Sequence, residues 1–389
     1  MRATVLKIAG LAIAFRIFSA LLALFVNVLF PNYQPEQFTV FGTPSAFWDA
    51  FARYDSGWYW QIARYGYIGG AGGYVEGGRS AIGFFPAYPI LMRYVGRAFG
   101  RRAVDLYLGG LVISWLAFAV AMVLVFYLAR LDVSRRRASW AVLLATTFPF
   151  AFIYGTVYSE ALFLAATVGC VYLFRTKRWV LGGLCGALAT ATRVNGIMMW
   201  PALAWIVWQQ VGGSKAASRA EQLRAAAGLL LVPLGIGAYS LYIFAITGRP
   251  FEWAATIERW GYHPGGSPVS VLWVLGHALV TRPYAFLAGE RMAPYDSLNG
   301  LAAVFAILAV PFVWRSLGAA YGVFMAANLW LPLSSGQVEG MGRYVAVLFP
   351  LFIWLAKVCP RRMLIGVAVL FAMLYTLCLA LFTNLHPLF

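Results

Sequence analysis

The sequence carries very little charge, and acids are its scarcest charged residues. Only 11% of its 389 residues are Asp, Glu, Lys or Arg, and 13 are acidic, whereas about 25% of an ordinary soluble domain is charged. Hydrophobic residues make up 62% of the chain, and several apolar runs reach the roughly 18–20 residues that span a bilayer. These features exclude a soluble domain and predict an all-α polytopic membrane protein.

Cysteine, histidine and the common metal and nucleotide motifs are nearly missing. The chain has three His and four Cys, no CxxC, DxD or HExxH, and no P-loop. His263 and His277 stand alone, without partners at metal-ligand spacing, and the cysteines lie in or beside apolar segments, where free thiols serve packing. No cofactor or metal site is expected, although an assisting divalent ion is not excluded.

Hydropathy divides the chain into eleven expected spans within a single domain, residues 1–389. The N-terminus then lies on one side of the membrane and the C-terminus on the other. The expected spans are 8–30, 105–129, 138–154, 158–174, 179–192, 196–211, 224–246, 298–314, 316–333, 344–357 and 363–383.

The net charge of +17 follows this topology. Every turn on the N-terminal side is basic, as in residues 135–137, 175–178 and 357–362, and its only acids are Asp132 and Glu221. Positive loops mark the cytoplasmic side, so the charge indicates orientation and does not indicate nucleic-acid binding. We expect a prokaryotic plasma-membrane protein whose opposite, outer side carries the polar loops.

The first expected span contains a charge. Arg16 lies in the apolar run 8–30, which resembles a retained signal anchor because it is long and lacks a clear cleavage site. A buried arginine at this depth is costly and usually faces a bundle interior or a cavity. The alternative is that its side chain reaches back toward the membrane surface beyond Lys7.

Residues 31–104 form the first long outer loop and carry the most informative stretch. Asp55, Tyr59, Ile62 and Gly66 recur at helical spacing, which predicts an amphipathic helix lying along the membrane interface.

Two further outer segments are expected to lie at the interface. The Gly-rich run 66–78 is predicted to be a mobile loop that closes on a ligand, and 84–99 to be a second interfacial helix. Residues 247–297 form the second long outer segment, which is rich in the Trp and Tyr typical of an interfacial layer.

Ionisable residues in the outer turns are expected to surround one cavity. Glu160, Arg193 and the pair Glu339 and Arg343 each adjoin apolar spans, and Asp55 joins them from the first loop. Arginine matches phosphate oxygens, and a carboxylate serves as a general base. The set therefore suits a lipid-linked, phosphate-bearing substrate, with a base that deprotonates an attacking sugar hydroxyl and arginines that stabilise the departing phosphate.

Each of these residues also has an ordinary structural interpretation. Asp55 could cap its own helix, and Asp49 could be a cap or a solvated acid. Glu160 begins a helix, where a carboxylate is favourable in any case. Arg193 and Arg343 could be interfacial anchors.

Five stretches resemble the membrane mannosyltransferases of the PIG-V type, which belong to the GT-C class of polyprenyl-phosphate-sugar glycosyltransferases. The likeness is most specific in the first third of the chain. It rests on YDSGWYWQIARYGY (54–67), GFFPAYPIL (83–91), YSEALF (158–163), ATRVNG (191–196) and GRYVAVLFPLF (342–352).

The resemblance implies a GT-C fold and an inverting, metal-independent transfer of mannose from a polyprenyl-phosphate donor to a lipid- or glycan-linked acceptor. By motif position Asp55, and not Asp49, would be the base. The resemblance also gives Glu160, Arg193 and Asn195 supporting roles at the substrate. The family's Trp before the acid is Tyr54 here, and Trp58 replaces the polar residue three positions beyond the acid.

Tyr59, Arg343 and Glu339 complete the expected substrate site. Two other functions compete with a glycosyltransferase. A transporter or flippase of lipid-linked sugars would more often show pseudo-symmetric halves and broken mid-membrane helices, and a structural subunit would leave the placement of the arginines without a reason.

Overall fold

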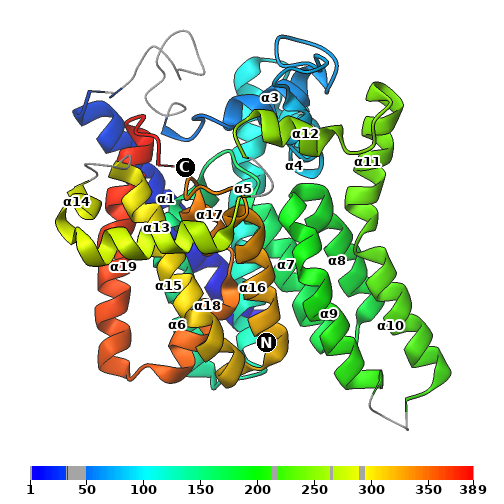
Figure 1. Cartoon of the computed structure of the whole chain (residues 1–389), viewed down its shortest axis with the longest axis vertical. Helices are drawn as coiled ribbons and strands as arrows, with labels where there is room; N and C mark the ends of the chain where they lie inside the picture. The colour runs from blue at the N-terminus through cyan, green and yellow to red at the C-terminus, as the bar shows by residue number, and fades with distance from the viewer. Residues whose placement is uncertain are drawn as a thin grey trace.

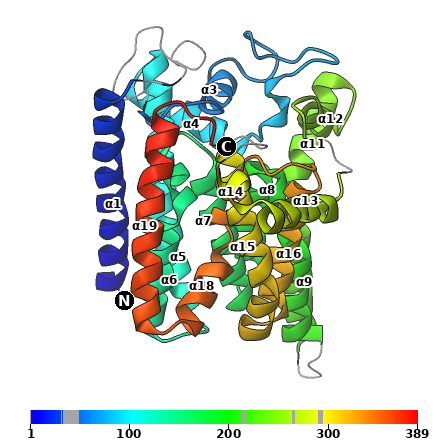
Figure 2. The same cartoon turned by 60° about the vertical axis from the view of Figure 1, so that its left-hand side comes forward.

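A computed structural model describes residues 2–31, 33, 50–212, 217–262, 266–288 and 294–388. These residues form helices joined by turns, and no strand occurs among them (Figures 1 and 2). The helices of the bundle are α1 (Arg2–Leu29), α5 (Ala103–Ala129), α6 (Arg135–Thr147), α7 (Glu160–Arg175), α8 (Trp179–Thr192), α9 (Trp200–Val207), α10 (Arg219–Leu231), α11 (Leu234–Thr247), α15 (Pro294–Leu317), α16 (Ala319–Leu333), α17 (Met341–Ala346), α18 (Phe349–Val358) and α19 (Arg361–Thr383).

Within the described residues, four helices, α1, α5, α15 and α19, are long and apolar enough to cross a membrane. At 1.5 Å per residue, the 27 residues of α5 extend about 40 Å, more than the roughly 30 Å of a hydrocarbon core. Large apolar side chains such as Leu11, Phe18 and Leu370 remain exposed on these helices, as expected of surfaces that face lipid. The chain is an integral membrane protein.

Two further candidate spans are bent where proline interrupts them. Helix α6 meets the 3-10 helix η3 (Pro149–Gly155) at 79°, and α10 meets α11 at 41°, with Pro233 at the second break. Proline lacks the N–H that would continue the helical hydrogen bonds. Counting these pairs gives up to six spans by length and composition, so the expected number of about eleven is not confirmed. The remaining expected spans coincide with shorter helices, such as α8 over 179–192.

A layer of short helices covers the end of the bundle opposite the N-terminus (Figure 1). It contains α3 (Ser56–Tyr65), the 3-10 helix η2 (Ala81–Gly83), α4 (Ala87–Phe99) and α12 (Glu252–Arg259). The two segments that were expected to form interfacial helices are helical, as α3 and α4. Helices α4 and α5 pack closely where Gly96 faces Gly109. A Cβ on Gly109 would lie only 2.4 Å from the Gly96 backbone nitrogen, so this approach requires glycine.

Two more helices, α13 (Pro268–Thr281) and α14 (Pro283–Ala288), continue the second long segment. Helix α13 runs across the bundle rather than along it (Figures 1 and 2). Its side chains Val269, Trp273 and Val280 are each more than two-thirds exposed, as suits a helix that lies against lipid.

Arg16 faces the interior of the bundle. Its side chain is fully buried, and its Nη1 donates a hydrogen bond to the Ala151 carbonyl at 3.1 Å. The guanidinium lies over the Phe118 ring, 4.2 Å from its centroid. Helices α1, α5 and η3 thus enclose the charge, and the alternative of a side chain that reaches the membrane surface is wrong.

Candidate active site

Four charged residues from distant parts of the sequence meet beneath the α3 layer. Asp55 immediately precedes α3, Glu160 is the first residue of α7, Arg193 follows the last residue of α8, and Arg343 lies in α17. We call these four residues the Asp55 cluster. Salt bridges connect all of them, so four of the five ionisable residues that were expected to gather lie together, and Glu339 is not among them.

Asp55 presents its carboxylate to the cluster instead of capping its helix. It occupies the N-cap position of α3, but its side chain makes no capping hydrogen bond. Its Oδ2 accepts a hydrogen bond from Arg343 Nη1 at 2.9 Å, and the side chain stays 24% exposed. A carboxylate that serves as a cap would bond a first-turn N–H. The capping interpretation is therefore not supported by this geometry.

The turn before α3 fixes where this carboxylate points. Tyr54 has a φ of 49°, and it is one of three residues other than glycine with positive φ in the described part of the chain. This left-handed conformation costs about 1–2 kcal/mol for an ordinary residue. The Asp55 N–H donates to the Tyr158 hydroxyl at 3.2 Å, and the Ser56 hydroxyl donates to the Val157 carbonyl at 3.1 Å. These bonds tie the strained turn to the chain just before α7.

Glu160 connects the two arginines. Its Oε1 accepts a hydrogen bond from Arg193 Nη1 and lies 3.7 Å from Arg343 Nη1. The side chain is only 1% exposed, and its Oε2 has no hydrogen-bond partner among the described residues. A buried carboxylate is stable only when it is paired, so the two guanidiniums hold Glu160 in place and Glu160 holds them side by side.

Aromatic rings support both arginines. The Arg193 guanidinium lies 5.2 Å from the centroid of the Tyr344 ring, and that of Arg343 lies 5.6 Å from the Tyr158 ring. Cation–π contacts of this length stabilise a partly desolvated guanidinium. Both side chains are largely buried, at 13% and 8% exposure. Such burial does not fit simple interfacial anchors.

Tyr59 lies beside the cluster without bonding to its charged groups. Its hydroxyl shares a hydrogen bond of 2.9 Å with Ser159, and its ring packs edge-on against Tyr88. Burial, reinforced by the charge of Glu160, raises the pKa of Tyr59 above its ordinary value. The hydroxyl therefore stays protonated at neutral pH.

Three of the expected residues are less directly connected. Asn195 is buried two residues after Arg193, in the 3-10 helix η4 (Val194–Met199), but no hydrogen bond joins it to the cluster among the described residues. Glu339 is exposed in the turn before α17. Partial loss of water raises its pKa, against the opposing charge of Arg343. Asp49 lies outside the described residues.

Tyr158 and Ser159 are site residues that the sequence analysis missed. Tyr158 touches both Asp55 and Arg343, and Ser159 bonds Tyr59. Both stand in the YSEALF motif directly before Glu160. Their position directly before Glu160 could have indicated them, but neither side chain is charged at neutral pH, and charge was the property by which site residues were predicted.

The described residues contain no group of three or more His, Cys, Asp and Glu side chains that could hold a metal ion. The carboxylates of the cluster, Asp55 and Glu160, are both paired with arginine.

Several solved structures of one archaeal enzyme are similar to this chain. The crystal structure of the Archaeoglobus fulgidus oligosaccharyltransferase in its apo form matches with a TM-score of 0.50 and 14% sequence identity, over 97% of this chain and 56% of that chain. The chain shares the fold of an oligosaccharyltransferase. At this identity the likeness shows a shared fold alone.

Two further structures of the same enzyme match less closely. One is tethered to an acceptor peptide through a disulfide bond (TM-score 0.47, 14% identity, 97% of this chain and 55% of that chain). The other is in complex with an inhibitory peptide and a dolichol-phosphate (TM-score 0.42, 12% identity, 97% and 56%). The chain spans about half the length of these proteins. No protein-family model and no curated protein matches the sequence.

Proposed function

We propose that the chain is a membrane glycosyltransferase that transfers a sugar from a polyprenyl-phosphate donor to an acceptor hydroxyl, with Asp55 as the general base. The observation that carries the proposal is the Asp55 cluster itself. It holds a partly exposed carboxylate 2.9 Å from a buried arginine, which Glu160 connects to a second arginine, in a chain that shares its fold with a glycosyltransferase. A base and a phosphate-binding pair are the two groups that this transfer needs.

The transfer forms one bond and breaks one bond. As Asp55 removes the proton of the acceptor hydroxyl, the hydroxyl oxygen attacks the anomeric carbon of the donor sugar. The bond from that carbon to the phosphate oxygen breaks, and polyprenyl phosphate leaves with the electron pair. Attack from the face opposite the phosphate inverts the anomeric centre. Arg343 and Arg193 stabilise the charge that grows on the phosphate.

Arg343 links donor binding to the base in this mechanism. Without substrate, Asp55 and Glu160 neutralise the Arg343 charge. A donor phosphate offers the same guanidinium a second set of oxygens, and arginine binds phosphate well through two parallel hydrogen bonds. When the phosphate binds Arg343, the ion pair between Arg343 and Asp55 breaks, and the Asp55 carboxylate is free to accept a proton. Donor binding therefore precedes acceptor activation.

The finer assignments rest on the motif resemblance and on the charge pattern. The PIG-V-type stretch 54–67 favours mannose as the sugar. The basic turns on the N-terminal side favour an active site on the outer face of a prokaryotic plasma membrane. Apolar helices around the cluster suit a polyprenyl chain, and the acceptor is lipid- or glycan-linked.

Transfer from synthetic polyprenyl-phosphate mannose by the purified protein tests the proposal. Acceptors are supplied as a membrane lipid and glycan extract, and the new glycosidic bond is detected by mass spectrometry. Wild type should form product and Asp55→Asn should form none, because the amide cannot accept the proton. Glu76→Gln is the matched control, since Glu76 is 73% exposed in the same loop. Asp49→Asn distinguishes the two acids of the loop.

Three results would contradict the proposal. Full activity in Asp55→Asn would exclude the base assignment, and loss of activity in Asp49→Asn alone would move the base to Asp49. Movement of labelled lipid-linked sugar across vesicles without any new glycosidic bond would instead indicate a transporter.

A further inference from the structure

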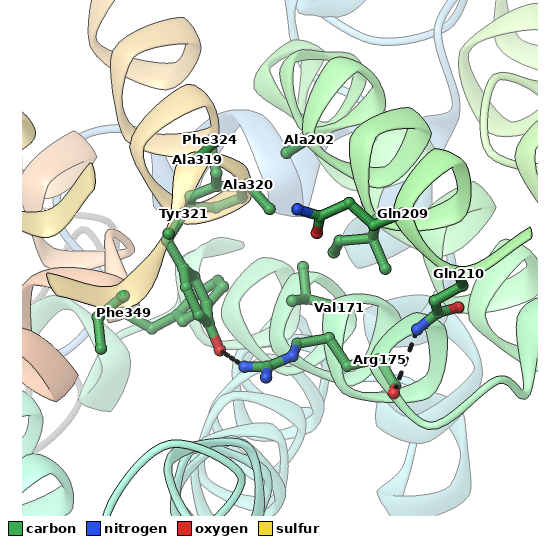
Figure 3. A pocket seen from close by; sticks show the side chains of 13 residues that line it. Val171, Arg175, Ala202, Gln209, Gln210, Ala319, Ala320, Tyr321, Phe324 and Phe349 are labelled. Carbon is green, nitrogen blue, oxygen red and sulfur yellow. Dashed lines mark hydrogen bonds between the residues drawn. The ribbon is translucent and has the colours of Figure 1, made fainter. Parts of the chain in front are cut away.

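A cavity of about 330 Å³ lies at the opposite end of α7 from the Asp55 cluster (Figure 3). Helix α7 begins with Glu160 and ends with Arg175, so its 16 residues separate the two places by about 24 Å. The other walls come from α9, from the π-helical turn Trp208–Gly212, from the start of α16 and from α18. The cavity is therefore separate from the proposed active site.

Arg175 is the only charged side chain among the described residues that line the cavity. Its Nη1 donates to Asp132 Oδ2 at 2.5 Å and to the Tyr321 hydroxyl at 2.8 Å. Those two bonds use the hydrogens of Nη1. In the described part of the chain no hydrogen bond of Nε or Nη2 is found, and these two atoms form the other edge of the guanidinium, which can bind an anion with two parallel bonds.

Two glutamines add amide groups to the same wall. Gln210 is fixed in place, because its amide donates to the Phe174 carbonyl at 3.1 Å and accepts from the Trp179 indole N–H at 2.8 Å. Gln209 is exposed, and Figure 3 shows its side-chain amide directed into the cavity. A π-helical turn carries both residues, and such turns occur frequently at functional sites.

The remaining lining is apolar. Val171, Ile206, Phe324 and Phe349 form the part away from Arg175. The cavity thus has one polar wall and one apolar wall. Such a cavity suits a small molecule that has both a polar group and an apolar part.

We propose that this cavity binds a phosphate group, with the Arg175 fork and the Gln209 amide as its donors. Among the described residues the lining contains no Asp or Glu, and the nearby Asp132 is already paired with Arg175 and Tyr321, so this lining suits an anion better than a cation. The phosphate belongs either to a soluble phosphate compound or to a phospholipid headgroup whose chain lies along Val171 and Phe324. Both sources share the same recognition chemistry.

The test uses the delipidated full-length protein in a non-ionic detergent and two kinds of probe. Inorganic phosphate is titrated while thermal stability is followed. Separately, native mass spectrometry compares binding of phosphatidylglycerol with binding of diacylglycerol, which lacks the phosphate. Arg175→Lys keeps the charge beside Asp132 but removes the fork, and Ala320→Phe fills the cavity from the start of α16. Arg178→Lys is the matched control, because Arg178 is exposed in the adjacent turn.

We expect phosphate-dependent binding in wild type and in Arg178→Lys. Arg175→Lys should weaken phosphate binding about tenfold or more, since a hydrogen bond to a charged group contributes about 1.5–3 kcal/mol. Ala320→Phe should abolish the binding. Binding of inorganic phosphate supports a soluble source, whereas preference for phosphatidylglycerol over diacylglycerol without such binding supports a headgroup. The proposal fails if wild type responds to neither probe, or if Arg178→Lys weakens binding as much as Arg175→Lys does.

Discussion

Replacing Glu160 with Gln tests whether one carboxylate holds the two arginines of the Asp55 cluster together. Glu160 is 1% exposed, and Arg193 and Arg343 are 13% and 8% exposed. The amide keeps the shape of the side chain but removes its charge, so two buried guanidiniums lose the anion that they share. Breaking a buried ion pair from one side typically costs about 3–5 kcal/mol. We expect a loss of stability in this range.

The expected change in melting temperature follows from chain size. With an unfolding entropy of roughly 2.1 cal/mol/K per residue, the 389 residues give about 0.8 kcal/mol/K, so 3–5 kcal/mol corresponds to a decrease of about 4–6 °C. Thermal unfolding of the purified protein, followed by intrinsic fluorescence in one fixed detergent, measures this shift. Glu76→Gln provides the baseline for an exposed carboxylate, where a surface pair contributes at most about 1 kcal/mol.

A second substitution separates charge from packing. If Glu160→Gln destabilises by leaving Arg193 unpaired, then adding Arg193→Gln should restore part of the loss, with a coupling of about 0.5–3 kcal/mol between the two sites. Strictly additive effects would mean that the two side chains act independently. A melting temperature for Glu160→Gln equal to that of Glu76→Gln would refute the reasoning altogether.

Three other substitutions have defined outcomes. Arg16→Met should leave stability unchanged or raise it by about 1–3 kcal/mol, since it removes a buried cation whose Nε and Nη2 have no hydrogen-bond partner among the described residues. A lower melting temperature would argue against this. Gly342→Ala should destabilise the protein by about 1–3 kcal/mol, because the new Cβ would lie 2.2 Å from the Phe150 ring. Gly276→Ala is the control in the same thermal assay and should not destabilise the protein, because the space around Gly276 is open. Arg343→Lys should lower kcat for sugar transfer by tenfold or more, because lysine loses the paired hydrogen bonds to phosphate, and unchanged kinetics would remove Arg343 from the donor site.

Much of the helical layout could be predicted from hydropathy. The expected span 179–192 coincides with α8, and 105–129 differs from α5 by two residues at its start. Uninterrupted apolar runs and basic turns are local features of the sequence, which is why they predict the positions of these helices. The expected number of about eleven spans is not confirmed among the described residues, because several expected spans are helices of only 10–17 residues, such as α8 and α16, and because Pro149 and Pro233 bend two of the longer runs.

The four charged members of the Asp55 cluster could be predicted from the sequence, but their neighbours Tyr158 and Ser159 and the pairing of the charges could not. Ionisable residues in outer turns suggested that Asp55, Glu160, Arg193 and Arg343 would gather at one end. The pairing of Asp55 with Arg343 joins positions 288 residues apart, and Glu160 could equally have faced water at the start of its helix. Which carboxylate pairs with which arginine depends on how α7 and α17 pack, and local sequence does not encode that packing.

The buried Arg16 has a consequence for the order in which the protein is assembled. The first helix to be synthesised carries a cation, and the carbonyl that accepts its hydrogen bond belongs to Ala151, far later in the chain. Placing an arginine at the centre of a membrane helix costs about 2.5–3.5 kcal/mol during insertion. We therefore predict that α1 waits beside the insertion machinery until η3 has emerged. Crosslinking of chains stalled before and after residue 151 measures this, and release of α1 from the earlier chains would disprove it.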